Sequence, residues 1–174
     1  TTGYGRNAIK FKERDITEIT CHAKGAFFIN PNVRTIIDIG GQDSKIIRLN
    51  EKGEVRDFVM NDKCAAGTGK FLEMMASSLG LTLEEMSKLG FKSREKIIIS
   101  SMCSVFAQSE VVSLVARGRR LEDIVAGING SVAAKVTALA GLRKMEKEWM
   151  MTGGVAKNTG VVAALEERLK GKII

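Results

Sequence analysis

The hydrophobic and polar positions of the chain follow two periods, and these periods predict its elements. Short apolar runs bounded by turn residues are typical of strands, whereas apolar residues three and four positions apart indicate helices. The predicted strands are residues 33–39, 44–49, 55–60, 97–99 and 149–151. The predicted helices are residues 16–28, 70–79, a short one begun by a capping box at 82–85, one that follows 100–104 and ends at 116, 121–144, and about 158–170.

The order of these elements predicts a mixed α/β architecture. Three strands come first in hairpin order, with residues 50–53 as one turn, and helices and later strand–turn–helix units follow. The 174 residues are enough for one domain or for pieces of two.

Composition and charge exclude several classes of protein. The chain is 44% hydrophobic and 27% charged, which is ordinary for a globular protein. Its net charge is +7, but acidic and basic residues interleave, which favours scattered surface charges over one basic face. With 5% aromatic residues and no basic–aromatic pattern, we expect no nucleic-acid partner. No apolar run approaches the roughly 18–20 residues that span a bilayer, so we expect no membrane association.

The first candidate site is the segment from Asp38 to Asp43, at the end of a buried strand. Gly40 and Gly41 would let the backbone approach a phosphate. Asp38 would hold a magnesium-bound water, and Gln42 would orient an attacking water. The alternative is a hairpin turn whose glycines serve only its dihedral angles.

The second candidate site lies between a predicted strand and a predicted helix. Gly153 and Gly154 precede the helix, and glycines at a helix N-terminus suit an anion or the sugar–phosphate edge of a nucleotide. The alternative is a tight turn with Asn158 as N-cap. Neither this segment nor residues 67–70 form a Walker A loop.

The third candidate site is a pair of cysteines. Three widely spaced cysteines do not form a disulfide framework, and they favour a reducing compartment. Cys64 and Cys103 each precede a predicted helix, whose positive end favours a negatively charged cluster. An iron–sulfur cluster takes four cysteines, so a symmetric dimer would complete the set. The alternative is two ordinary buried cysteines. Cys21 is predicted in the core, and the adjacent His22 is predicted to be structural.

Together these segments resemble the activator (component A) of 2-hydroxyacyl-CoA dehydratases, within the BadF/BadG/BcrA/BcrD ATPase family that also includes subunits of benzoyl-CoA reductases. The matching strings are TGYGR at 2–6, IDIGGQD at 37–43, NDKCAAGTG at 61–69, SMCSVFAQSE at 101–110, GINGSVA at 127–133 and MTGGVAKN at 151–158. They run in the family's order over nearly the whole chain.

The resemblance implies an actin/Hsp70/sugar-kinase-like (ribonuclease H-like) ATPase fold. Residues 1–174 would form an ATPase and iron–sulfur core from parts of two actin-like subdomains. The family's first phosphate motif, Asp-x-Gly-Ser/Thr, and its Gly/Ala-rich C-terminal helix are absent. We therefore expect a chain that lacks the N-terminal strands and the C-terminal helix of the fold.

The resemblance also implies cofactors and site residues. ATP or ADP with Mg²⁺ would bind at the second phosphate loop, formed by Asp38 and residues 40–42, with Gln42 tied to hydrolysis. Gly153, Gly154 and Asn158 would lie at the adenosine side. A [4Fe–4S] cluster shared across a homodimer would take Cys64 and Cys103 of each subunit as its metal ligands.

The implied function is ATP-dependent electron transfer in an anaerobic cytoplasm. A ferredoxin or flavodoxin would donate the electron, and a 2-hydroxyacyl-CoA dehydratase or a benzoyl-CoA reductase-type component would accept it. One alternative is a small-molecule kinase of the same superfamily, which would contain no iron. The other is a non-catalytic iron–sulfur module, which would hydrolyse no ATP.

Overall fold

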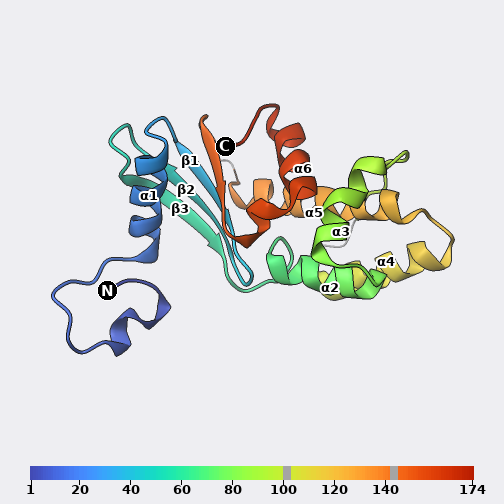
Figure 1. Cartoon of the computed structure of the whole chain (residues 1–174), viewed down its shortest axis with the longest axis horizontal. Helices are drawn as coiled ribbons and strands as arrows, with labels where there is room; N and C mark the ends of the chain where they lie inside the picture. The colour runs from blue at the N-terminus through green and yellow to red at the C-terminus, as the bar shows by residue number, and fades with distance from the viewer. Residues whose placement is uncertain (100–102, 142–144) are drawn as a thin grey trace.

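The structure is a computed structural model that describes residues 1–99, 103–141 and 145–174. A four-stranded sheet carries helices on both faces, and further helices gather beyond one end of it (Figure 1). The predictions for residues 100–102 and 142–144 lie outside the described residues. In the part that is described, no helix is long and apolar enough to cross a membrane.

The sheet has the strand order β3-β2-β1-β4. Its strands are β1 (Thr35–Ile39), β2 (Ser44–Leu49), β3 (Val55–Asn61) and β4 (Trp149–Thr152). The first three form an antiparallel meander, and β4 joins β1 in parallel. All five residues of β1 are buried, because this central strand is covered on both faces. The predicted mixed α/β architecture is confirmed.

Six α-helices and three short 3₁₀ turns are present in the described residues. The helices are α1 (Glu18–Ile29), α2 (Gly69–Leu79), α3 (Leu83–Leu89), α4 (Ser104–Ala116), α5 (Leu121–Leu139) and α6 (Thr159–Leu169). The 3₁₀ turns are η1 (Tyr4–Ala8), η2 (Gly90–Lys92) and η3 (Gly154–Lys157). The capping box predicted at Thr82 is present, with Thr82 and Glu85 bonding each other's backbone N–H groups. The segment before α1, which contains η1, lies apart from the sheet (Figure 1).

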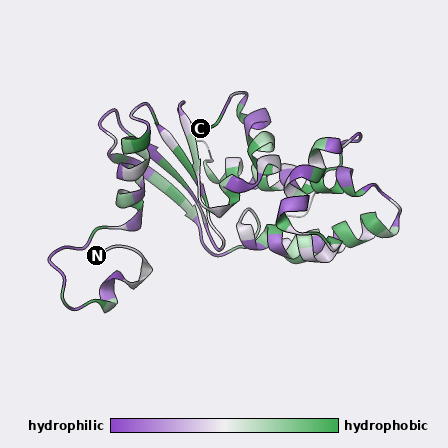
Figure 2. Ribbon diagram, viewed as in Figure 1, coloured by the Kyte–Doolittle hydropathy of each residue, from purple (hydrophilic) through white to green (hydrophobic). Residues whose placement is uncertain are grey.

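The strand residues alternate between two hydrophobic cores. Ile36 and Ile47 point to the face that α1 covers, where they join Ala23 and Ala26 of that helix. Ile37 and the other residues of the opposite set face α5 and α6. Apolar residues therefore line both faces of the sheet. The hydropathy colouring of the ribbon shows hydrophobic residues along the strands (Figure 2).

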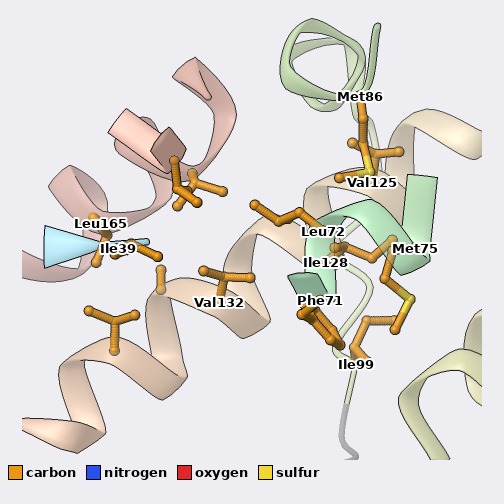
Figure 3. Packing of buried hydrophobic residues seen from close by; sticks show 14 of the residues in the cluster. Ile39, Phe71, Leu72, Met75, Met86, Ile99, Val125, Ile128, Val132 and Leu165 are labelled. Atoms are coloured by element: carbon orange, nitrogen blue, oxygen red, sulfur yellow. The ribbon is translucent and has the colours of Figure 1, made fainter. Parts of the chain in front are cut away.

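The larger core extends away from the sheet along α5. Figure 3 shows Ile39 of β1 near Leu165 of α6, then Val132 of α5, and farther along α5 the cluster that includes Leu72 and Met75 of α2. One continuous core thus joins the sheet to α2, α3 and α4. This continuity positions these helices relative to the loops at the end of β1.

The strand predicted at residues 97–99 is wrong. These residues have no regular secondary structure, and Ile98 is 71% exposed while Ile99 is buried. The segment instead crosses α5, where a Cβ on Gly127 would lie 2.8 Å from the Ile97 carbonyl oxygen. Three apolar residues are consistent with a strand, but here Ile97 and Ile99 pack against the helical core, and none of the three pairs with a strand in the described residues.

The long helix predicted over residues 121–144 ends earlier, at Leu139. Ala140 caps it, and Gly141 follows with a φ of +61°, a left-handed conformation that glycine adopts without strain. The apolar period continues past the stop, so periodicity alone overestimated the length.

Candidate functional site

A cleft of about 530 Å³ opens where the β1–β2 turn, α2, α3 and the β4–α6 connection meet. Three predicted residues line it, namely Gly41 from the first candidate site and Gly154 and Asn158 from the second. The parallel pairing of β1 with β4 explains this convergence, because it places the carboxyl ends of both strands at the same edge of the sheet. The other predicted residues, Asp38, Gly40, Gln42 and Gly153, do not line the cleft.

The turn after β1 is bonded directly to the start of α2. Gly40 N–H donates to the Asp43 carbonyl at 2.9 Å, which closes the turn. The carbonyls of Gly40 and Gly41 accept hydrogen bonds from Gly69 N–H and Lys70 N–H, both at 2.8 Å. The two backbones approach so closely that a Cβ on Gly69 would lie 3.1 Å from Gly41 Cα. The predicted phosphate turn and the first turn of α2 are therefore linked directly by backbone hydrogen bonds.

The exposed part of this turn is free to meet a ligand. A Cβ on Gly41 would contact nothing within 4 Å, so its outer surface is open. Gln42 is exposed, and its side chain makes no hydrogen bond to the residues that the structure describes. An unengaged amide at the edge of the turn is compatible with the predicted role in orienting water, which stays a prediction.

Asp38 belongs to a buried polar cluster beneath the turn. In the sheet register Asp38 lies opposite Lys45 of β2 and Thr152 of β4, so the three side chains share the face that α1 covers. Thr152 Oγ1 donates to Asp38 Oδ1 at 3.0 Å, and Lys45 Nζ lies 3.6 Å from Asp38 Oδ2. His22 Nδ1, from α1, lies 3.8 Å from the same oxygen. The carboxylate of Asp38 is thus held by protein groups, and its role toward magnesium stays a prediction.

Lys45 is the cation of this cluster. It is buried, and its Nζ donates to Asp43 Oδ2 at 2.7 Å. Burial alone would lower the pKa of Lys45, but the hydrogen bond to Asp43 and the charges of Asp43 and Asp38 outweigh it and raise that pKa. Lys45 therefore carries its charge between two carboxylates that flank the glycine turn.

The second glycine loop needs glycine at one position only. Gly153 has a φ of +83°, and a Cβ there would lie 2.3 Å from the Ile39 carbonyl oxygen at the end of β1. Gly154 has open space around it and faces the cleft. Asn158 is the N-cap of α6, with its Oδ1 accepting from Val161 N–H at 3.0 Å. The interpretation of Asn158 as a cap is confirmed, and the same residue also lines the cleft.

The opposite wall of the cleft was not predicted. It comes from α2 and α3, which contribute Leu72 and Leu83 to the lining, and Val155 of η3 also lines the cleft. Charged residues also line the cleft, namely Glu73, Glu84, Lys88 and Lys157. The capping box located the start of α3, but no signal in the sequence places that helix opposite Gly154, since only the packed core brings them together.

The two cysteines predicted to bind metal lie near the starts of α2 and α4. Cys103 is the exposed N-cap of α4, as the prediction required. Cys64 is half-buried in the β3–α2 loop and precedes α2, which begins five residues later at Gly69. Helices α2 and α4 pack together, and Gln108 Nε2 donates to Ser78 Oγ at 2.8 Å between them. The prediction that Cys21 lies in the core is wrong, because Cys21 is exposed on α1.

The donor set fits a cluster shared between two chains. All three cysteines are free thiols, and Cys64 and Cys103 both have accessible surface. Within residues 1–99, 103–141 and 145–174, no three His, Cys, Asp or Glu side chains are grouped to hold a metal ion. One chain therefore offers at most the two thiolates of Cys64 and Cys103, which is half of the four that a [4Fe–4S] cluster takes.

The fold and the cleft define a class of nucleotide-binding α/β proteins in which two glycine loops meet at one edge of a sheet. The chain belongs to the BadF/BadG/BcrA/BcrD ATPase family, whose model matches residues 1–174. The family predicted from the sequence motifs is thereby confirmed.

Several proteins of named function are similar to this chain in sequence. The chain is 51% identical over 173 residues to an activator of lactoyl-CoA dehydratase from Anaerotignum propionicum, covering 99% of this chain and 67% of that protein. It is 52% identical over 169 residues to the (R)-2-hydroxyglutaryl-CoA dehydratase activating ATPase of Acidaminococcus fermentans, covering 97% and 65%. The chain thus spans about two thirds of the length of these relatives.

A solved structure confirms the predicted fold class. The activator of the 2-hydroxyisocaproyl-CoA dehydratase from Clostridium difficile, with bound ADPNP, matches with a TM-score of 0.93 and 45% identity. The match covers 99% of this chain and 65% of that one. The chain therefore has the actin/Hsp70/sugar-kinase-like fold that the resemblance implied.

Proposed function

We propose that this chain is the core of an ATP-hydrolysing activator, which passes a low-potential electron to a 2-hydroxyacyl-CoA dehydratase or a related reductase. Residues 1–174 form its ATPase and iron–sulfur core, with parts of two actin-like subdomains. A ferredoxin or flavodoxin donates the electron. When bound between two copies of the chain, a [4Fe–4S] cluster supplies the one-electron carrier.

One observation carries the proposal. The backbone of the phosphate turn is hydrogen-bonded through Gly40 and Gly41 to Gly69 and Lys70, and these residues directly follow the loop that holds Cys64. A change at the turn when a γ-phosphate binds or leaves is thus transmitted to the cysteine loop without an intervening flexible segment. Nucleotide switches act in this way, by biasing an element that has two arrangements.

The residues that line the cleft would bind the nucleotide. Gly41 and Gly154 leave open backbone at the cleft, while the exposed Leu83 provides apolar surface for a base. Magnesium accompanies the ATP phosphates, and Gln42 orients the attacking water. The names of the relatives, which are dehydratase activators, support the same partner class for this chain.

The test is to purify the protein without oxygen and to measure iron, acid-labile sulfide and ATP hydrolysis. We expect about four irons and four sulfides per dimer, together with ATPase activity. A protein that stays free of iron after anaerobic reconstitution would refute the electron-transfer proposal. It would favour the alternative function of a small-molecule kinase. Iron without ATPase activity would favour the non-catalytic module.

Three matched variants test which cysteine thiols bind the iron. Cys64→Ser and Cys103→Ser are each expected to lose most of the bound iron. Cys21→Ser is the control, since Cys21 is also a free thiol, exposed like Cys103, but lies on α1. Equal iron content in all three variants would exclude Cys64 and Cys103 as ligands.

A further inference from the structure

The loop that carries Cys64 is fixed by side chains. Four successive carbonyl oxygens, those of residues 64–67, each accept a hydrogen bond from within the chain. Thr68 Oγ1 donates to the Ala65 carbonyl at 2.7 Å, and the buried Ser44 Oγ donates to the Gly67 carbonyl at 2.5 Å. A loop in which every carbonyl of one stretch has a donor has little freedom to rearrange, because each lost bond leaves a polar group unpaired.

Asn61 provides the other donors of this set. Its Nδ2 donates to the carbonyl of Cys64 at 2.8 Å and to that of Ala66 at 3.2 Å. Its Oδ1 accepts from Cys64 N–H at 3.3 Å. One side chain therefore holds both backbone polar groups of Cys64.

Asn61 is itself anchored to the sheet. It is the last residue of β3 and pairs with Ser44 of β2, the residue that follows the phosphate turn and bonds Gly67. The amide group is the chemistry that this position requires. An aspartate would accept from Cys64 N–H but would present no donor to the two carbonyls, and alanine would supply neither.

We propose that Asn61 is a positioning residue, which fixes the backbone of Cys64 and thereby the direction in which its thiolate meets a metal cluster. The inference rests on the proposed function in one respect, namely that Cys64 is a cluster ligand. The holding of the Cys64 backbone is a property of the chain alone and can be tested without metal.

The first experiment measures alkylation of the metal-free protein by iodoacetamide, with each cysteine followed by mass spectrometry. Loss of the hydrogen bonds in Asn61→Ala should raise the alkylation rate of half-buried Cys64 about fivefold or more, since leaving one polar group of the loop unpaired changes loop opening by at least about that factor. The exposed Cys21 and Cys103 serve as internal references whose rates should not change. Asn61→Asp, which keeps only the acceptor, should behave like Asn61→Ala.

Asn50→Ala is the matched control. Asn50 also organises a turn through its side chain, with Oδ1 accepting from Lys52 N–H and Glu54 N–H at 2.9 Å, but in the β2–β3 hairpin. Asn50→Ala should leave the alkylation rate of Cys64 unchanged. Circular dichroism verifies that all variants remain folded under the assay conditions.

The second experiment takes the reconstituted dimer and records the EPR spectrum of the reduced cluster. Asn61→Ala should broaden or shift the signal relative to wild type and Asn50→Ala. An unchanged Cys64 alkylation rate would overturn the proposal, and so would faster alkylation with an unchanged spectrum, because Asn61 would then only pack the loop. A wild-type protein that binds no iron would refute the proposed function instead, while the alkylation result would still stand.

Discussion

At the scale of single residues, a buried polar cluster lies under the β1–β2 turn. Lys45 is the only cation among the three cross-strand neighbours Asp38, Lys45 and Thr152, and it also bonds Asp43. His22 reaches the same carboxylate from α1. The cluster holds the ends of β1 and β2 together at the point where the glycine turn begins.

Replacing Lys45 by methionine should destabilise the protein by roughly 3 kcal/mol, because Asp38 would remain buried without its cation. The sign of the pH dependence follows from the raised pKa of Lys45. Its stabilising contribution is complete below the unfolded pKa of about 10.4 and is lost as the pH rises through the folded pKa. The free energy of unfolding of the wild type and of Lys45→Met is measured with denaturant at pH 7 and above pH ~10.5. The difference between the two free energies should be smaller at the higher pH.

The control for this prediction is Lys172→Met. Lys172 pairs with Glu166, but its side chain is 90% exposed, so its loss should cost less than about 1 kcal/mol. A Lys45→Met protein as stable as this control would show that the cluster contributes nothing to the fold.

At the scale of elements, local signals predicted most of the fold. The strands around the β1–β2 turn, the capping box of α3 and the helix after Asn158 were predicted nearly to the residue, since each has its own periodicity and boundary residues. Residues 97–99 failed because a short apolar run does not specify whether a strand or a helix will cover it. Likewise, Gly141 was a stop signal that the continuing apolar period obscured.

The site was predicted less completely than the fold. Glycine loops and cysteines are visible as motifs, so Gly41, Gly154 and Asn158 were found. The wall formed by α2 and α3 was missed because it depends on tertiary packing through α5. The cluster under Asp38 was missed for a similar reason, since it depends on strand register and on the face that α1 covers.

The connection from β4 to α6 gives a prediction at this scale. Gly153→Ala should destabilise the protein by at least about 2 kcal/mol, because alanine is strained at positive φ and its Cβ would collide with the backbone of β1. Gly154→Ala, one residue later and in open space, should change stability by less than about 0.5 kcal/mol. Thermal unfolding of both variants tests this prediction. Equal losses of stability in the two variants would contradict the close approach of Gly153 to Ile39.

At the scale of the whole molecule, the cleft draws on segments from much of the chain. The β1–β2 turn, α2, α3 and the β4–α6 connection each contribute one side. A ligand that contacts all of them binds only the assembled fold. It should therefore raise the stability of the molecule as a unit.

We expect ADP with Mg²⁺, at about one hundred times its dissociation constant, to stabilise the chain by about 2.7 kcal/mol, or roughly 5–10 °C in melting temperature. Gly41→Ala should reduce this shift, because a methyl group would occupy the open face of the turn. Gly25→Ala, on exposed α1 surface with open space around it, should keep the shift. Differential scanning calorimetry with and without nucleotide measures the shift in melting temperature. An equal shift in both variants would show that the β1–β2 turn does not contact the nucleotide.

The pairing of β1 with β4 also has a consequence for biosynthesis. Asp38 and Thr152 lie 114 positions apart, so the edge of β1 stays uncovered until nearly the whole described chain has left the ribosome. At about 5–20 residues per second, roughly 2–9 s separate the emergence of Cys103 from that of β4. The thiols of Cys64 and Cys103 are thus both outside the ribosome before β4 can pair with β1 and before the cleft can form.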